Sequence, residues 1–268
     1  MLKDITIGQY YPGQSLLHRL DPRTKIIGMI LYMVGVFLIQ DLWDYAYVIL
    51  FTAVIIGLSG IPFKMLLKGL KPLWLILLFT MILHFFMTPE GNILWQWKFL
   101  EITDAGVRRG IFMAFRLILL INVTSLLTLT TTPIVLTDGL EYLMKACFIP
   151  MAHELAMMMT IALRFIPTLI EETEKIMNAQ IARGADFENG NLLSRAKNLI
   201  PLLIPLFISA FRRADDLALA MEARCYRGGE GRTRMRQLKM SLGDWLAILF
   251  MLAFIGLCIA DRYWLTVI

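Results

Sequence analysis

The stretch Gly110–Val135, GIFMAFRLILLINVTSLLTLTTTPIV, contains 26 residues and one ionisable side chain, Arg116. A helix rises ~1.5 Å per residue, so that ~20 apolar residues cross the ~30 Å hydrocarbon core of a bilayer. This stretch is therefore predicted to span a membrane. Four further apolar runs accompany it, at Ile26–Gln40, Tyr45–Phe63, Pro72–Pro89 and Trp245–Ala260. Together the runs predict about five membrane-spanning helices.

The composition of the whole chain agrees with a membrane protein. Of its 268 residues 58% are hydrophobic and 18% charged, and the mean hydropathy is +0.66. Typical soluble domains are ~45–50% apolar and ~25% charged. Such a high apolar content excludes a disordered chain. Cys147, Cys225 and Cys258 form no CxxC pair, which excludes a disulfide-built secreted domain and indicates free thiols.

The charges between the runs predict an orientation. Basic residues precede the first and third runs (Lys3, Arg19, Arg23, Lys25; Lys64, Lys68, Lys71), and acidic residues dominate after them (Asp41, Asp44; Glu90, Glu101, Asp104). The positive-inside rule then predicts a multi-pass protein of the cell membrane with a cytoplasmic N-terminus. Arg108 and Arg109 depart from the pattern because they would lie outside, where we expect them to reach lipid headgroups.

Residues 136–240 are more charged than the rest of the chain. Two long helices are predicted there, at about 151–182 and 192–223, each apolar in its first half and charged in its second. We expect the apolar halves to lie against the membrane or the spans, and the charged halves to project into the cytoplasm. A seven-span arrangement, in which these two helices also cross the membrane, is the alternative.

The predicted fold class is therefore an all-α integral membrane protein, with about five transmembrane helices plus two long cytoplasmic helices. N-terminal transmembrane helices are expected in residues 1–135, the cytoplasmic helices in residues 136–240, and a C-terminal transmembrane helix in residues 241–268.

The two long helices are predicted to end in similar tips. One ends with Ala182, Arg183 and Gly184, and the other ends 41 residues later with Ala223, Arg224 and Cys225. Small neighbours leave each guanidinium unobstructed, and its planar fork suits bidentate docking to a carboxylate. The alternative is that arginine merely complements the helix dipole, which contributes ~0.3–1 kcal/mol. Because the tip occurs twice on paired helices, we favour docking to two similar receptors.

The chain resembles the transmembrane T component of energy-coupling factor (ECF) transporters, which are vitamin and metal importers of the ATP-binding-cassette (ABC) class. The segment Leu20-Asp21-Pro22-Arg23-Thr24-Lys25 and the two arginine tips carry the resemblance. They occur in the family's order, and the plan of spans followed by coupling helices covers nearly the whole chain. The second tip has Cys225 where Gly or another small residue also occurs in the family.

This resemblance implies a non-catalytic scaffold that binds no cofactor. The scaffold would join two cytoplasmic ABC ATPase subunits to a separate membrane-embedded substrate-binding subunit, the S component, and couple ATP hydrolysis to vitamin or micronutrient uptake. Ala182, Arg183, Gly184, Ala223, Arg224 and Cys225 would bind the ATPases, with each arginine facing acidic residues in a groove. Motion of the coupling helices would then be passed to the S component, which holds the substrate.

A self-contained secondary transporter is the rival interpretation. Such a carrier usually has ionisable groups deep within its spans. His84 and Arg116 are the candidates here, and both are expected near the outer ends of their spans, where anchoring is the favoured role. No GxxxxGK[ST] motif occurs in the chain, which argues against ATP binding by a P-loop.

Other motifs support neither an enzyme nor a metal site. Asp215-Asp216 lacks the further acids that a metal-phosphate site requires, and position 157 is Met, so that His153-Glu154 is not part of HExxH. The basic run Arg232, Arg234, Arg236 and Lys239 is expected to contact anionic membrane lipid rather than nucleic acid.

Overall fold

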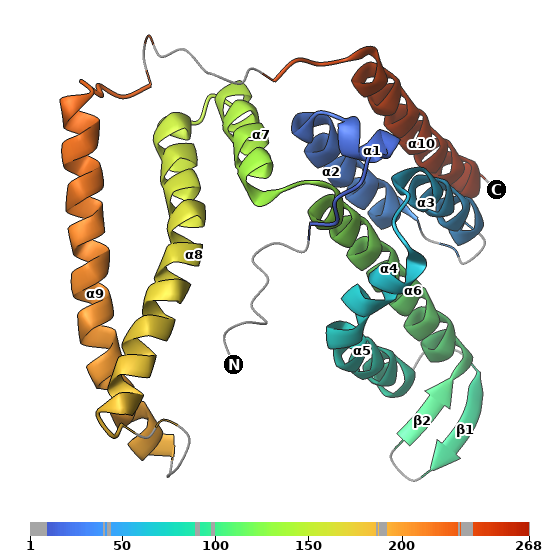
Figure 1. The fold of residues 1–268 in the computed structure, drawn as a ribbon. Coiled ribbons are helices and arrows are strands. Elements are labelled where there is room, and N and C mark those ends of the chain that lie inside the picture. Colours follow the sequence, from blue (N-terminus) through green and yellow to red (C-terminus); the bar gives the residue numbers. More distant parts are fainter. Residues whose placement is uncertain are drawn as a thin grey trace. The chain divides into compact units, whose positions relative to one another are not determined.

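The protein is described by a computed structural model that covers residues 10–39, 41, 44–88, 92–97, 100–185, 187, 192–229, 231 and 238–267. Helices dominate these residues (Figure 1), and a pair of antiparallel strands, β1 (Ile93–Trp97) and β2 (Leu100–Thr103), joins α5 to α6. The helices are α1 (Leu16–Arg19), α2 (Pro22–Leu38), α3 (Tyr45–Ser59), α4 (Phe63–Leu70), η1 (Lys71–Leu73), α5 (Trp74–Met87), α6 (Asp104–Thr130), α7 (Pro133–Ala146), α8 (Ala152–Ala182), α9 (Leu192–Ala223) and α10 (Leu242–Val267). The all-α fold class is confirmed.

The chain divides into two compact units. Residues 8–139 and 238–268 form the first, which holds α1 to α6 and α10 and is called the bundle below. Residues 1–7 and 140–237 form the second, which holds α8 and α9 and is called the hairpin unit. The boundaries lie within a few residues of positions 135 and 240, where the charge pattern of the sequence changes.

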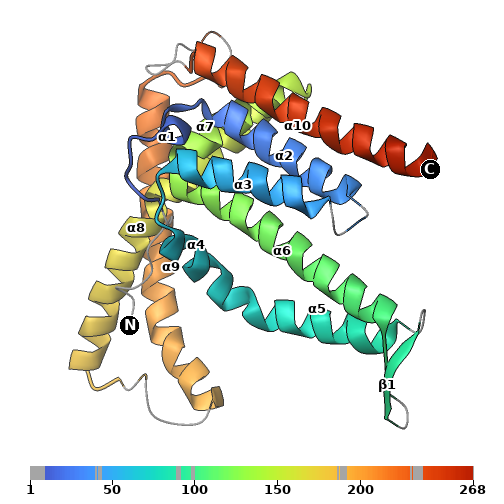
Figure 2. The ribbon, with the colours of Figure 1, turned by 90° about the vertical axis from the view of Figure 1, so that its right-hand side faces the viewer.

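Within the bundle, α10 packs along α2 and α5 packs along α6, while α3 and α6 run opposite to α2 (Figure 2). Aromatic rings fill the centre, where Tyr32 stacks on Phe51 at 6.2 Å and on Phe254 at 5.6 Å between centroids. Tyr32 is fully buried, and its hydroxyl forms a hydrogen bond of 2.6 Å with the hydroxyl of Thr52. Stacked aromatic pairs contribute ~0.5–1.5 kcal/mol beyond burial, so that this cluster fixes how α2, α3 and α10 pack.

The outward faces of the bundle are apolar. Trp74, Phe79 and Met87 on α5 are 59, 60 and 73% exposed, and α4, η1 and α5 together form a 25-residue apolar segment, Phe63–Met87. Contiguous exposed apolar surface of this kind is rare on soluble proteins. Among the residues that the structure describes, four helices are long and apolar enough to cross a membrane, namely Phe63–Met87, Asp104–Thr130, Ala152–Ala182 and Leu242–Tyr263, and Tyr45–Ser59 is a shorter apolar helix.

The hairpin unit pairs α8 and α9 in antiparallel fashion (Figure 1). Arg213 donates to Glu172 at 3.0 Å, and Gln180 donates its side-chain amide to the Pro201 carbonyl at 3.4 Å. The second contact has a local cause, because Pro205 has no N–H and leaves that carbonyl without its helical donor. The pairing places the charged half of each helix beside the apolar half of the other. Both helices end at the residues that the sequence pattern predicted, 182 and 223.

Candidate partner-docking site

The two arginine tips have the same backbone structure. At the end of α8, Gly184 N–H donates to the Ile181 carbonyl at 2.9 Å and Ala185 N–H donates to the Gln180 carbonyl at 3.0 Å. At the end of α9, Cys225 N–H donates to the Glu222 carbonyl at 2.8 Å and Tyr226 N–H donates to the Met221 carbonyl at 3.0 Å. This pair of bonds is the Schellman motif, which satisfies the last carbonyls of a helix. Arg183 and Arg224 therefore occupy equivalent C-terminal positions.

Each Schellman motif requires a left-handed residue directly after the arginine. That residue is Gly184 (φ 89°) in the first tip and Cys225 (φ 55°) in the second. Glycine adopts this conformation freely, whereas a residue with a Cβ is strained by roughly 1–2 kcal/mol. Backbone geometry therefore favours Gly184 in the first tip, whereas Cys225 adopts the same conformation in the second tip at a cost in strain.

The strain at these positions gives a paired prediction. Gly184→Val is expected to destabilise the first tip by about 1–2 kcal/mol and to speed hydrogen exchange at Ala185 several-fold. Cys225→Gly is expected to slow exchange at Tyr226, because the relieved strain exceeds the ~0.5–1 kcal/mol entropic cost of glycine. Exchange measured by mass spectrometry on the purified protein checks both changes. Gly57→Ala is the control, since a Cβ there meets no atom within 4 Å. Unchanged exchange in both tip variants would reject the shared motif.

Both guanidiniums are available to a partner. Arg183 and Arg224 are exposed, and neither makes an ion pair or side-chain hydrogen bond with any residue that the structure describes. The antiparallel pairing places the two tips at opposite ends of the hairpin (Figure 1). Pro201 contacts α8 three residues before Arg183, and the 23 residues from Pro201 to Arg224 span roughly 35 Å at 1.5 Å per residue. A single small receptor does not reach both.

A buried polar cluster supports the second tip, and the sequence pattern did not reveal it. His153 Nδ1 lies 3.0 Å from Glu141 Oε1, and Lys145 Nζ lies 3.1 Å from the same oxygen. Glu141 is 5% exposed, and His153 Nε2 is buried without a hydrogen-bond partner among the described residues. The segment that follows the Arg224 tip lies on this imidazole, since a Cβ at Gly229 would be 2.6 Å from His153 Cδ2. His153 thus pairs with a residue on α7, twelve positions earlier.

We predict that Gly229→Ala disturbs the second tip. The added methyl group has no room against the imidazole, and overpacking of this kind costs about 1–3 kcal/mol. Amide exchange at residues 224–226 is expected to rise several-fold, while exchange at the first tip stays unchanged. Gly256→Ala provides the matched control, because a Cβ there meets open space within α10. Equal exchange in the two alanine variants would show that the segment does not rest on His153.

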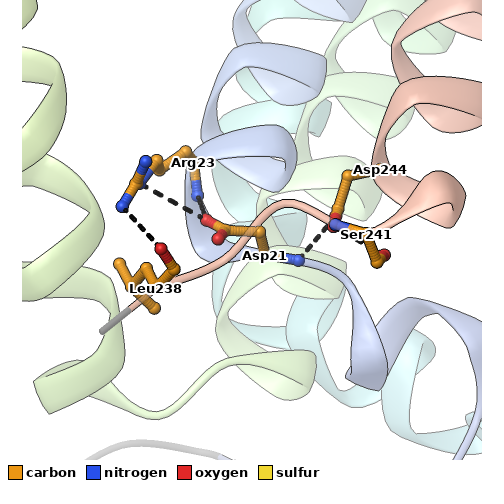
Figure 3. A network of polar contacts seen from close by, with 5 residues as sticks. All are labelled: Asp21, Arg23, Leu238, Ser241 and Asp244. Carbon is orange, nitrogen blue, oxygen red and sulfur yellow. Dashed lines mark hydrogen bonds and ion pairs between the residues drawn. The ribbon is translucent and has the colours of Figure 1, made fainter. Parts of the chain in front are cut away.

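The segment Leu20–Lys25 joins the ends of three helices in the bundle. Asp21 caps α2 by accepting from the Arg23 backbone N–H at 3.0 Å, and Pro22 fits the first helical position, where no N–H is needed. The Asp21 backbone N–H donates to Asp244 Oδ1 at 2.7 Å, at the start of α10 (Figure 3). Lys25 Nζ donates to the Thr130 carbonyl and the Thr131 hydroxyl at the end of α6, both at 3.1 Å.

Asp244 is the centre of this junction. It is 1% exposed, and its second oxygen accepts from the backbone N–H and the hydroxyl of Ser241 at 2.7 and 2.8 Å (Figure 3). Arg23 on α2 also donates to the carbonyl of Leu238, which precedes α10, at 3.4 Å. The Ser-x-x-Asp spacing of positions 241 and 244 is a capping-box signal that sequence analysis could have used. The Leu20–Lys25 segment therefore has a structural role that is separate from the tips.

The remaining residues singled out by the sequence have simpler surroundings. Asp215 and Asp216 are exposed, and the described residues contain no cluster of three or more side chains able to hold a metal ion. Lys239 is exposed, whereas Arg232, Arg234 and Arg236 lie outside the described residues. His84 and Arg116 line one pocket of the bundle.

The fold and the tips together define a class: a multi-span helical membrane protein that carries a helical hairpin with two matched arginine ends. The family described as "Cobalt transport protein" (CbiQ) matches residues 13–235. Relatives named "Energy-coupling factor transporter transmembrane protein EcfT" are 59% identical over 256 residues in Acidaminococcus fermentans (94% of this chain, 95% of the relative) and 55% identical over 268 residues in Clostridium kluyveri (98% and 99%). A Bacillus subtilis relative of the same name is 54% identical over 241 residues (89% and 91%).

The chain therefore belongs to the family of energy-coupling factor transporter transmembrane proteins, and the resemblance found in its sequence is confirmed. It is a membrane protein with a transport function, as the transmembrane component of such a transporter.

Proposed function

We propose that this chain couples ATP hydrolysis by two cytoplasmic ABC ATPase subunits to uptake of a vitamin or other micronutrient. Arg183 and Arg224 each dock in an acidic groove of one ATPase, and a separate membrane-embedded S component carries the substrate. The observation that supports this most is that the two tips share one backbone motif, are both exposed, and lie at opposite ends of the hairpin. Two equivalent ends fit two equivalent receptors.

In this proposal the bundle spans the membrane and the hairpin unit lies in the cytoplasm. The alternating directions of α2, α3, α5, α6 and α10 fit five spans with a cytoplasmic N-terminus. The basic residues Lys64 and Lys68 then lie inside and Asp41 and Asp44 outside, as the positive-inside rule requires. α8 is long and apolar enough to cross a membrane, but a crossing by α8 and α9 would embed Glu172 and Arg213 in lipid, which is costly.

We also propose that the chain is a non-catalytic scaffold. The ATP-binding motif absent from its sequence would be supplied by the ATPases, and the substrate pocket by the S component. The arginine tips would transmit motion: ATP binding draws the ATPases together, the two ends of the hairpin move with them, and the apolar halves of α8 and α9 pass the movement to the S component.

Reconstitution tests this function against its rivals. The tagged chain is co-expressed with an ABC ATPase pair and an S component from its own cell, and native mass spectrometry of the purified complex is expected to show one copy of each subunit. ATP-dependent uptake of the vitamin bound by that S component is then measured in liposomes. Uptake by the purified chain alone under an ion gradient would instead identify a secondary transporter. A purified complex that contains the chain and the S component but neither ATPase would contradict the proposed coupling.

A further inference from the structure

An apolar pocket of about 640 Å³ lies in the bundle, at the end that holds α1. Its walls come from α2, α3, α6 and α10, and the side chains that line it include Ile27, Leu31, Ile55, Leu126, Ala247 and Ile248. Gly28 of α2 places no side chain in this space, and a Cβ there would first meet Met251 of α10, at 3.5 Å. Water finds few polar partners between such walls, whereas hydrocarbon fits them.

The pocket is closed at both ends along the helix axes. Phe250 of α10 lies at one end, where its ring stacks on the ring of Phe51 of α3 with 4.8 Å between centroids. Helix α1 lies at the other end, beside the end of α3, since a Cβ at Gly60 would be 3.6 Å from Ser15 Cβ. The space therefore has a defined length between the ring contact and α1.

The pocket is open on the side that α3 and α10 share. Val54 and Leu58 of α3 line it and are 43 and 45% exposed, and Leu246 of α10 lines it and is 66% exposed. These side chains belong to the apolar outer surface of the bundle, which contacts lipid in a membrane protein. Hydrocarbon of the bilayer can therefore enter the pocket without passing a polar group.

A cation lies at the α1 end of the pocket. Arg19 lines the pocket, is exposed, and makes no ion pair or side-chain hydrogen bond with any residue that the structure describes. Lys25 lines the same end, but its Nζ already donates to the carbonyls of His18 and Thr130 and to the hydroxyl of Thr131. Arg19 is thus the basic group with donors to offer, and a guanidinium can bind a phosphate through two parallel N–H bonds.

A molecule with a phosphate head and hydrocarbon chains fits both parts of this site. We propose that the pocket holds one acyl chain of a membrane phospholipid, whose phosphate binds Arg19. The acyl chain fills the space that the side chains of α3 and α10 leave between the Phe51–Phe250 contact and α1. The bound lipid joins α1 to α3 and α10 and stabilises the folded bundle by mass action. The site is separate from the arginine tips, which belong to the hairpin unit.

Lipid fragments test whether both parts of the site are used. The detergent-purified protein is titrated with dioctanoyl phosphatidylglycerol, with dioctanoylglycerol, which lacks the phosphate, or with glycerol 3-phosphate, which lacks the acyl chains. Native mass spectrometry counts the adducts. The intact lipid is expected to bind at least about tenfold more tightly than either fragment, because it alone uses the apolar walls and the guanidinium. Equal binding of glycerol 3-phosphate would overturn the role of the pocket, and equal binding of dioctanoylglycerol would overturn the role of Arg19.

A filled pocket tests where the acyl chain lies. Ala247→Phe places a ring in the pocket and is expected to weaken binding of dioctanoyl phosphatidylglycerol at least about tenfold. Ala253→Phe makes the same change at an exposed position of α10 outside the pocket lining and is expected to leave binding unchanged. The proposal is overturned if the two phenylalanine variants bind this lipid alike.

A change at the rim keeps the test decisive if Ala247→Phe does not fold. Arg19→Gln alters an exposed side chain, so that it is expected to fold, and it should weaken binding about tenfold. Lys64→Gln is the matched control, because it removes the same charge from an exposed position at the start of α4, close to the end of α3. Equal lipid binding by Arg19→Gln and Lys64→Gln would show that only general surface charge attracts the lipid, which would reject the site.

Discussion

The double variant Arg183→Ala/Arg224→Ala is expected to lose the ATPase pair during purification while inserting into the membrane at normal levels. Each arginine is exposed at a helix end that is closed by backbone hydrogen bonds. Its guanidinium makes no ion pair or side-chain hydrogen bond with the described residues, so that it can bind a partner. Truncating one side of a desolvated charge pair costs about 2–5 kcal/mol, which is roughly a thirty-fold to several-thousand-fold loss of affinity.

The single variants distinguish docking from a local helix effect. Arg183→Ala and Arg224→Ala are each expected to weaken assembly, and the two losses are expected to add because the tips lie roughly 35 Å apart. Arg183→Lys keeps the charge but loses the planar fork, and is expected to retain only part of the affinity. An arginine that merely complemented the helix dipole would be replaced by lysine at no cost.

Pull-down of the tagged chain from detergent, followed by quantification of both ATPase subunits, measures these effects. Arg212→Ala is the matched control, since Arg212 is exposed on α9 but lies in the middle of the helix. Full capture of both ATPases by the double variant would reject the arginine tips as anchors. ATP hydrolysis that continues without uptake in a captured single variant would identify that tip as the coupling contact.

The sequence predicted the helices of this protein more completely than their contacts. The ends of α8 and α9 follow from local signals, because glycine stops a helix and Gly184 follows the first tip while Gly228 and Gly229 soon follow the second. The matched tips follow from the same local pattern. Their separation does not, since it depends on antiparallel pairing that is fixed by contacts such as Arg213 with Glu172, 41 residues apart.

Long-range polar contacts were not predictable from spacing alone. The spacing around His153 and Glu154 shows only that they do not belong to HExxH, whereas the structure pairs His153 with Glu141 on another helix. Arg116 is predicted to have an anchoring role near the outer end of its span, and the structure adds contacts that spacing does not reveal, because its guanidinium lies over the rings of Phe37 and Phe112 and donates to the Ile39 carbonyl. In both cases the side chain has several allowed directions, and only tertiary packing selects one.

Asp244→Ala is expected to cause the largest loss of stability among changes in the bundle. The carboxylate is 1% exposed and accepts from the Asp21 backbone, the Ser241 backbone and the Ser241 hydroxyl at 2.7, 2.7 and 2.8 Å. Alanine would leave these donors buried without an acceptor, and would remove a negative charge that attracts Lys25 at the same junction. We expect a loss of about 3 kcal/mol or more, which is a large fraction of the ~5–15 kcal/mol that stabilises a typical protein.

Graded substitutions keep this prediction testable if the alanine variant does not accumulate. Asp244→Asn retains one oxygen acceptor but places an amide against the donors, so that we expect an intermediate loss, and Ser241→Ala removes a single hydroxyl at a cost of about 1 kcal/mol. The midpoint of thermal unfolding in detergent should therefore fall in the order Ser241→Ala, Asp244→Asn, Asp244→Ala. Asp215→Ala, at an exposed acid of α9, is expected to stay within about 0.5 kcal/mol of the unaltered protein.

The same variants show what the Leu20–Lys25 segment does. Because Asp244 binds the backbone of Asp21, its loss frees the start of α10 from the start of α2, and protease cleavage in the segment before α10 is expected to increase. Capture of the ATPases by Asp244→Asn should remain near normal at low temperature, since the arginine tips belong to the other unit. An Asp244→Ala protein that melts at the same temperature as Asp215→Ala would show that the junction does not hold these helices together.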